Sequence, residues 1–206
     1  MQANTSERQR TPTETPVDAT SEDGSEVGSG SDSPRVLTVV SCGATKKNIA
    51  GLERVPAREL YSSTVHTCKD RYGRHSHAYY IMSARHGLVH NQEKIGYYDE
   101  TLDEKTDFQV RLWGHWVACD IMREIEAADQ EFDAVVLIGS KTYVRGIIES
   151  SSLIPTPILT PWQTDDYVTG VGRGMAWANN EENWPVNVDS IEEIGEPVEP
   201  EWMSEQ

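Results

Sequence analysis

The sequence predicts a single three-layer α/β domain, in which a mostly parallel central sheet lies between two layers of helices. Three short runs, residues 36–41, 78–83 and 132–139, are apolar and rich in β-branched or aromatic residues. Between these runs lie longer segments whose apolar residues recur at helical spacing. This alternation is typical of parallel strands joined by crossover helices.

The strand runs differ in the environment they indicate. Residues 36–41 are almost wholly apolar and stop in a small polar loop, which predicts the first buried strand. Residues 132–139 lack polar–apolar alternation, as expected of a strand covered on both faces. Residues 156–160 are short and contain Pro157, which favours an edge strand. We expect residues 49–56 to cross the edge of the sheet.

Two helices show the clearest periodicity. The first is expected to begin at Ser62 or Ser63 as its cap and to end at Gly73. Its apolar face consists of Tyr61, Val65, Cys68 and Tyr72. The second begins near Thr106, and the two tryptophans in its stripe indicate a deeply packed helix. That stripe consists of Leu112, Trp113, Trp116, Val117, Ile121 and Ile125.

Charge is concentrated at the two ends of the chain. Residues 1–34 contain two basic and seven acidic residues, and residues 181–206 contain nine acidic and no basic ones. The middle is nearly neutral, with 16 basic and 18 acidic residues. Residues 1–34 have almost no large apolar side chain, and residues 181–206 are rich in acidic, proline and polar residues. We therefore expect disordered acidic tails at 1–34 and 181–206 around a domain at 35–180.

Composition also indicates the compartment. Three cysteines do not form a paired disulfide framework, and no apolar run is long enough to span a bilayer, so we expect a soluble, cytoplasmic protein with reduced thiols. Acidic tails with few lysines are compatible with a high-salt cytoplasm, as in haloarchaea, and equally with ordinary acidic tails. They disfavour nucleic acid as a partner, without excluding it.

Reactive side chains cluster where the predicted strands end. Because the carboxyl ends of parallel strands meet at one edge of a sheet, we expect a ligand pocket there. Gly87 permits a sharp turn after the second strand. The three loops contribute Ser41, Cys42, Gly43, Lys46 and Lys47; Ser83, Arg85 and His86; and Gly139 and Tyr143.

The chemistry of these residues is open to two interpretations. Cys42 is either a nucleophile, with His86 as its base, or a packed thiol at a strand end. Lys46 is either a ligand-anchoring charge or amine nucleophile, or an exposed loop lysine. Arg85 suits a phosphate or carboxylate because its guanidinium donates two parallel hydrogen bonds, and a surface salt bridge is the alternative. Asp99 is a candidate acid, base or acceptor for the edge of a base.

Other ligand classes find less support. The histidines have no acid or cysteine at a known zinc spacing, so we predict no metal site. The glycines at 170–174 lack the full dinucleotide fingerprint, and no phosphate loop ends in Gly-Lys-Ser or Gly-Lys-Thr. The sequence therefore identifies no cofactor.

Six motifs follow one another through the predicted domain: Ser41-Cys-Gly-x-x-Lys46, Glu59-Leu-Tyr-x-Ser63, Ser83-Ala-Arg-x-Gly-Leu88, Tyr98-Asp-x-Thr101, Gly139 with Tyr143, and Gly172-x-Gly-Met-x-Trp177. Together they resemble the domain of unknown function 6884 family, which occurs in archaea, bacteria and their viruses. The resemblance covers nearly all of residues 35–180 in order, and it implies no established reaction.

A second motif is similar to the core of archaeosine synthase, which transfers lysine to a deazaguanine base in transfer RNA. Cys42-x-x-x-Lys46 followed by Tyr61-Ser-x-x-x-His66 resembles its Cys-x-x-x-Lys-Pro-Tyr-Ser-x-Ser-x-x-His signature, although the Lys-Pro-Tyr tripeptide is absent here. The resemblance implies a uracil-DNA-glycosylase-like fold. It also groups Cys42, Lys46, Tyr61, Ser63 and His66 into one candidate cluster.

The main hypothesis is that the domain binds or modifies a nucleobase, nucleotide or similar polar ligand, as a transferase or hydrolase if it is an enzyme. Tyr61 or Tyr98 would then stack on a base. One alternative is a non-catalytic module that binds a nucleotide or nucleic acid in the same pocket. Another is a scaffold for a partner protein. The sequence does not indicate an oligomeric state.

Overall fold

The computed structural model describes residues 33–51, 53–163 and 171–198. Its central sheet has the strand order β4-β3-β1-β6-β7. β1 pairs in parallel with β3 and β6, β6 pairs in parallel with β7, and only β4 is antiparallel to its neighbour. The strands span Val36–Ser41 (β1), Ala78–Ser83 (β3), Gly87–His90 (β4), Ala134–Ile138 (β6) and Ile158–Leu159 (β7). The predicted mostly parallel α/β sheet and its short edge strand are confirmed.

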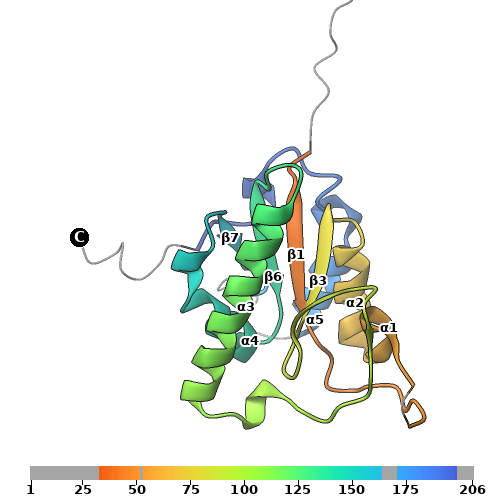
Figure 1. Cartoon of the computed structure of the whole chain (residues 1–206). Helices are drawn as coiled ribbons and strands as arrows, with labels where there is room; N and C mark the ends of the chain where they lie inside the picture. Colours follow the sequence, from red (N-terminus) through yellow and green to blue (C-terminus); the bar gives the residue numbers. More distant parts are fainter. Residues whose placement is uncertain (1–32, 52, 164–170, 199–206) are drawn as a thin grey trace, which may run out of the picture. The chain divides into compact units, whose positions relative to one another are not determined.

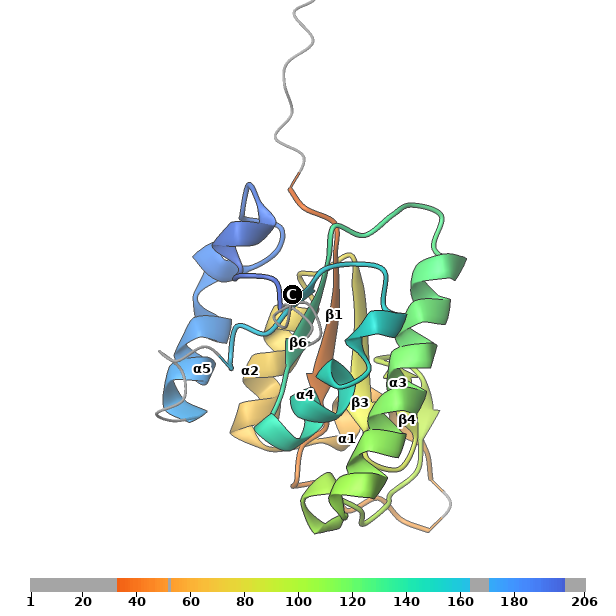
Figure 2. The ribbon, with the colours of Figure 1, turned by 90° about the vertical axis from the view of Figure 1, so that its left-hand side faces the viewer.

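Helices cover both faces of this sheet (Figures 1 and 2). On one face lie α2 (Thr64–Gly73) and α5 (Val171–Asn179), and on the other lie α3 (Asp107–Ala127) and α4 (Lys141–Ile148). A hydrophobic core lies on each face of the sheet, and alternate residues of β1 point into the two cores. Val36 and Val40 pack in the core that contains Trp177, whereas Leu37 and Val39 pack in the one that contains Trp113. The three layers are confirmed.

A second, two-stranded sheet lies outside the central one. β2 (Val55–Pro56) pairs in antiparallel fashion with β5 (Lys94–Ile95), and the single-turn helix α1 (Ala57–Leu60) follows β2. The prediction for residues 49–56 was therefore incomplete, because their last two residues form a strand. The passage from 91 to 102 contains β5, and the 3-10 turn η1 (Leu102–Glu104) follows it.

The long helix α3 is packed along a narrower stripe than expected. Trp113 is 6 % exposed, but Trp116 is 45 % and Leu112 61 % exposed, so the prediction of two deeply packed tryptophans was wrong. The reason is the close crossing of α3 over α4, where a side chain at Gly114 would collide with the backbone of Gly146. At this crossing the side of α3 that carries Gly114 is buried, and the neighbouring side that carries Leu112 and Trp116 remains exposed.

The C-terminal region differs most from the prediction. Residues 181–198 do not form a disordered tail: Trp184, Val188 and Ile194 are buried in the core. The ring of Trp184 stacks on His75 with centroids 3.8 Å apart. Two 3-10 turns, η3 (Glu181–Asn183) and η4 (Ile191–Glu193), carry four of the acidic residues of this region. Earlier in the chain, the 3-10 turn η2 (Ser151–Leu153) precedes β7. The folded part therefore extends past residue 180.

The predicted N-terminal tail lies almost wholly outside the described residues, and so do residues 199–206. Within the described part of the chain, no helix has both the length and the hydropathy needed to cross a membrane.

Candidate functional site

A cavity of about 300 Å³ lies at the carboxyl ends of β1 and β6, where the sequence places the candidate residues. One wall is the segment that follows β1, residues 41–44, and the opposite wall is the turn from β6 into α4, with Gly139, Ser140 and Tyr143. Helix α2 contributes Lys69 from the side. The remaining lining residues are Ser63, Val65, Glu100, Thr101, Asp103, Trp162 and Val171.

Cys42 is half-buried in this wall and faces Tyr143. Its sulfur lies 3.2 Å from the Tyr143 hydroxyl oxygen, which also accepts the backbone N–H of Leu102 at 3.4 Å. Since that oxygen already accepts a hydrogen bond, its own hydrogen is free to point at the sulfur. Burial, and then the charge of Cys42, raise the pKa of Tyr143 well above its usual range. Tyr143 therefore stays protonated at neutral pH, and its hydroxyl can donate to Cys42.

Lys69 is the most unusual side chain of the cavity, and the sequence analysis did not single it out. It is only 3 % exposed, and its Nζ donates to the carbonyl oxygen and to the hydroxyl of Ser41 at 2.6 and 2.7 Å. Burial lowers the pKa of Lys69 to about 8, against an opposing effect of Cys42. The sequence does contain one indication that Lys69 is buried. It lies four residues after Val65 and three before Tyr72, and so on the apolar face of the helix.

His66 lies behind the cavity rather than in its lining. It is 1 % exposed, and among the described residues neither ring nitrogen has a hydrogen-bond partner. Burial and the charge of Lys69 lower the pKa of His66 to about 3, although the nearby backbones of Ser41 and Arg58 oppose this shift. The imidazole is therefore neutral at physiological pH. Ser63 caps α2 by accepting the backbone N–H of His66, which fixes this turn beside Gly43.

A hydrogen-bonded network lies on the inner side of the site. The hydroxyl of Ser83 donates to that of Tyr98 at 2.8 Å, and the hydroxyls of Tyr98 and Tyr61 are 2.7 Å apart. Both tyrosines are 4 % exposed, and neither lines the cavity. The Tyr98 ring is also covered by Lys46, whose Nζ lies 4.5 Å from the ring centroid. This arrangement leaves neither ring facing the cavity for a base to stack on.

The loop after β3 turns away from the cavity. Gly87 has a φ of +70°, as the predicted turn requires, and the turn leads directly into β4. Arg85 is exposed and pairs with Glu100 at 2.7 Å. His86 is half-buried with its ring edge-on to Tyr98, and burial, followed by Arg85, lowers its pKa.

Of the predicted site residues, the structure brings Ser41, Cys42, Gly43, Ser63, Gly139 and Tyr143 together in the lining. It places Lys46, Tyr61, His66, Ser83 and Tyr98 around or behind this lining, and Arg85, His86 and the exposed Asp99 apart from it. No hydrogen bond joins His86 to Cys42 in the described part of the chain, where Tyr143 is the partner of the thiol.

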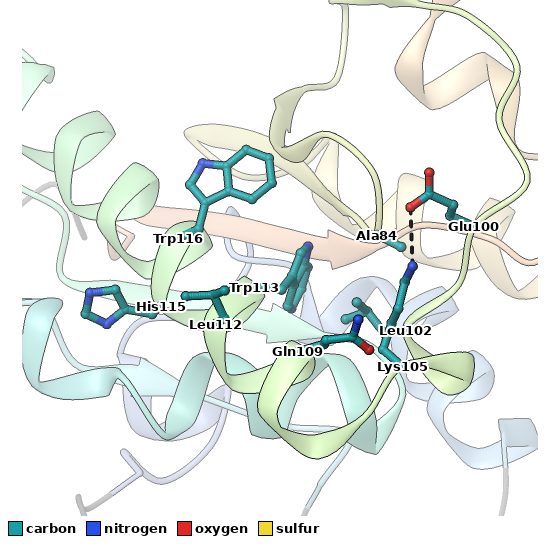
Figure 3. Close-up of a pocket in the computed structure, with 9 residues that line it drawn as sticks. All are labelled: Ala84, Glu100, Leu102, Lys105, Gln109, Leu112, Trp113, His115 and Trp116. Atoms are coloured by element: carbon teal, nitrogen blue, oxygen red, sulfur yellow. Dashed lines mark ion pairs between the residues drawn. The ribbon is translucent and has the colours of Figure 1, made fainter.

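A second hollow, of about 360 Å³, lies beyond the segment 100–105 and is shown in Figure 3. Its walls are mainly apolar side chains of α3, including Leu112, Trp113 and Trp116. Lys105 and Glu100 form an ion pair across its end at 3.6 Å. Glu100 lines both hollows, so the segment that carries it separates them.

The ionisable groups do not form a metal centre. Among the described residues, no group of three or more His, Cys, Asp or Glu side chains could hold a metal ion. The donors that face the cavity are a thiol, an ammonium, hydroxyls and the N-terminus of α4. These are groups that bind and orient a polar organic ligand or an anion.

Fold and site together define an α/β domain with a small pocket, lined by both polar and apolar side chains, at the carboxyl edge of a mostly parallel sheet. The sequence profile described as "Family of unknown function (DUF6884)" matches residues 37–178, and the chain belongs to this family. No curated protein and no solved structure matches the chain. The similarity to the archaeosine synthase core thus rests on the sequence motif alone.

Proposed function

We propose that the cavity binds a small polar ligand of the nucleobase, nucleoside or nucleotide class, and that Cys42 is the group that reacts with it. The observation that carries this proposal is the position of the Cys42 sulfur. It lies in the wall of a cavity of about 300 Å³ and is hydrogen-bonded to the hydroxyl of a buried tyrosine. A thiol that lines a partly enclosed cavity together with a buried ammonium and a tyrosine hydroxyl is placed for chemistry as well as for packing.

The size and lining of the cavity support this ligand class. A volume of about 300 Å³ is at the small end of ligand pockets, which suits one base or nucleoside. Lys69 and Ser140 supply donors to the cavity, and Glu100 and Asp103 supply acceptors. Trp162 adds an aromatic wall. A flat heterocycle carries both acceptors and donors on its edges and can use both sets.

A second candidate is a binding module without turnover. The observation that favours it is the position of the expected acid–base groups, because His86, Arg85 and Asp99 do not line the cavity. In such a module Cys42 would be a contact residue. If the domain is an enzyme, Lys69 and Tyr143 are the groups in the lining that can exchange a proton, and the reaction is a transfer or a hydrolysis at the ligand.

The test is thermal melting of the full chain with a panel of bases, nucleosides and nucleotides, because a ligand that binds the folded state raises the melting temperature. Ala44 lines the cavity and is exposed, so Ala44→Phe should fill the entrance without disturbing the core. Ala50→Phe, at an exposed loop position outside the lining, is the control. A compound that stabilises the wild type and Ala50→Phe, but not Ala44→Phe, supports the proposal.

Cys42→Ser then separates the two candidates. If the ligand is converted by the wild type, and Cys42→Ser binds it without conversion, the domain is an enzyme with Cys42 as its reactive group. If no compound shifts the melting temperature of the wild type, the proposed ligand class is wrong. If Cys42→Ser converts the ligand as fast as the wild type, the proposed role of the thiol is wrong.

A further inference from the structure

The cavity contains a buried positive charge that has no carboxylate partner in the described part of the chain. Lys69 is 3 % exposed, and Ser41, a neutral residue, supplies both acceptors of its Nζ. All seven ion pairs of the described residues involve other lysines and arginines. A buried ammonium is costly unless an anion compensates it. Two of its three N–H groups are used, and the third has no acceptor among the described residues.

A second positive feature opens into the same cavity. Helix α4 spans eight residues, Lys141–Ile148, and the side chain of its N-cap Ser140 makes no capping hydrogen bond. The first backbone N–H groups of α4 therefore lack the partner that a cap residue usually supplies. Gly139 and Ser140 line the cavity, so the positive end of the helix dipole lies at this wall.

The two features approach the cavity from different elements. Lys69 comes from α2 on one face of the sheet, and Ser140 precedes α4 on the other face. They meet at the carboxyl ends of the neighbouring parallel strands β1 and β6. The carboxylates in the lining belong to a different segment, and one of them, Glu100, is already paired with Arg85 and Lys105. Asp103 is the other.

We infer that the cavity holds its ligand by a phosphate group, placed between the Lys69 ammonium and the N-terminus of α4. Lysine acts as a point charge for phosphate, and free N–H groups at a helix start complete its hydrogen bonds. The inference rests on the proposed function and narrows its ligand class from nucleobases in general to phosphate esters. The phosphate could equally be free inorganic phosphate, and the experiment separates these two sources.

The experiment compares three probes on the full chain by thermal melting at constant ionic strength: sodium phosphate, guanosine and guanosine monophosphate, with the uridine pair in parallel. We expect a monophosphate to bind more tightly than its nucleoside, by about tenfold or more, which is the effect of one charge-assisted hydrogen bond. If inorganic phosphate raises the melting temperature as much as the nucleoside monophosphates do, the free anion is the ligand. The inferred anion site would then still be supported.

Two variants test the location. Lys69→Met should abolish the difference between nucleotide and nucleoside, whereas Lys47→Met, at an exposed lysine, should preserve it. Ser140→Glu places a carboxylate at the exposed N-cap and should also abolish it by repulsion. This second variant remains informative if Lys69→Met does not fold, because Ser140 is exposed and its side chain makes no capping hydrogen bond.

The outcomes distinguish this inference from the proposed function. If nucleosides bind and a phosphate adds nothing, the anion site is wrong and the nucleobase pocket stands. If phosphate or nucleotides stabilise the wild type, Lys69→Met and Ser140→Glu equally, the anion is bound elsewhere and the inference falls. If no probe stabilises the wild type, both the inference and the proposed function are wrong.

Discussion

The hydroxyl of Tyr143, on α4, lies 3.2 Å from the sulfur of Cys42, which directly follows β1. The two residues are 101 positions apart in the chain, and the pairing of β1 with β6 brings them together. This hydrogen bond joins the two walls of the cavity. It also gives the thiol a donor that cannot readily lose its proton.

Tyr143→Phe removes this donor and leaves the packing of the ring unchanged. We expect a loss of about 2 kcal/mol in the free energy of unfolding, because the hydroxyl is hydrogen-bonded both to Cys42 and to the buried backbone N–H of Leu102. We also expect slower alkylation of Cys42 by iodoacetamide at neutral pH, since the thiolate loses a hydrogen bond. Mass spectrometry of the labelled chain measures the rate. Tyr97→Phe, at a 52 % exposed ring, is the control and should change neither quantity.

Lys69 should make stability depend on alkaline pH. Its pKa is about 8 in the folded chain and about 10.5 in an unfolded one, so between these values the unfolded chain binds more protons. Stability contributed by this group therefore rises as the pH rises from 8 to 10.5, by at most about 3 kcal/mol. Urea unfolding of the wild type and Lys69→Met at pH 7.5 and 10 measures the difference between their slopes. Equal slopes in the two proteins would show that Lys69 is not held in a dry environment.

His66 should act at acidic pH. Its pKa is about 3 in the folded chain, compared with 6.5 in an unfolded one. As the pH falls below 6.5, the unfolded chain takes up a proton that the folded chain excludes, so stability is lost. Between pH 7 and pH 5 this loss amounts to about 2 kcal/mol. Urea unfolding of His66→Gln should lack this component, whereas the exposed His90→Gln should retain it. If the free energy of unfolding of His66→Gln falls between pH 7 and pH 5 as steeply as that of the wild type, the prediction is wrong.

Trp184 tests whether the C-terminal region belongs to the fold. Trp184 is 9 % exposed, stacks on His75 and donates its indole N–H to the carbonyl of Ala178 at 3.0 Å. We expect Trp184→Ala to lower the free energy of unfolding by about 3 kcal/mol, as for other large buried aromatic residues. Val186→Ala, at a 47 % exposed position two residues away, should change it by less than about 0.5 kcal/mol. Similar effects of the two substitutions would mean that this region does not pack as described.

The central strands could be predicted because their signal is local. Runs such as 36–41 and 134–138 are rich in β-branched and apolar residues without polar–apolar alternation, and this pattern predicts burial on both faces. The two-residue strands β2 and β5 carry too few residues for any periodicity. The burial of residues in 181–198 could not be predicted, because this segment is acidic and its buried residues show no regular spacing. Trp184 and Ile194 reach the core only through the tertiary fold.

The site could be predicted in part for a similar reason. Ser41, Cys42 and Gly139 follow strands, and the parallel topology fixes them at one edge of the sheet. Lys69 was missed because a lysine in a helix is usually solvated, and its burial depends on how α2 packs against β1. The sequence also did not predict that the chain turns back after β3 and forms β4, antiparallel to β3. His86 lies in this turn and therefore does not line the cavity with Cys42.

The most direct test of the proposed pocket is the labelling of Cys42 with iodoacetamide in the full chain, followed by mass spectrometry, at increasing concentrations of a compound that raises the melting temperature. Cys119, on α3 and outside the cavity lining, is an internal reference in the same molecule. We predict that the compound protects Cys42 over the same concentration range in which it stabilises the chain, and leaves Cys119 unaffected. A compound that stabilises the chain while Cys42 is labelled at its original rate would contradict the proposed pocket.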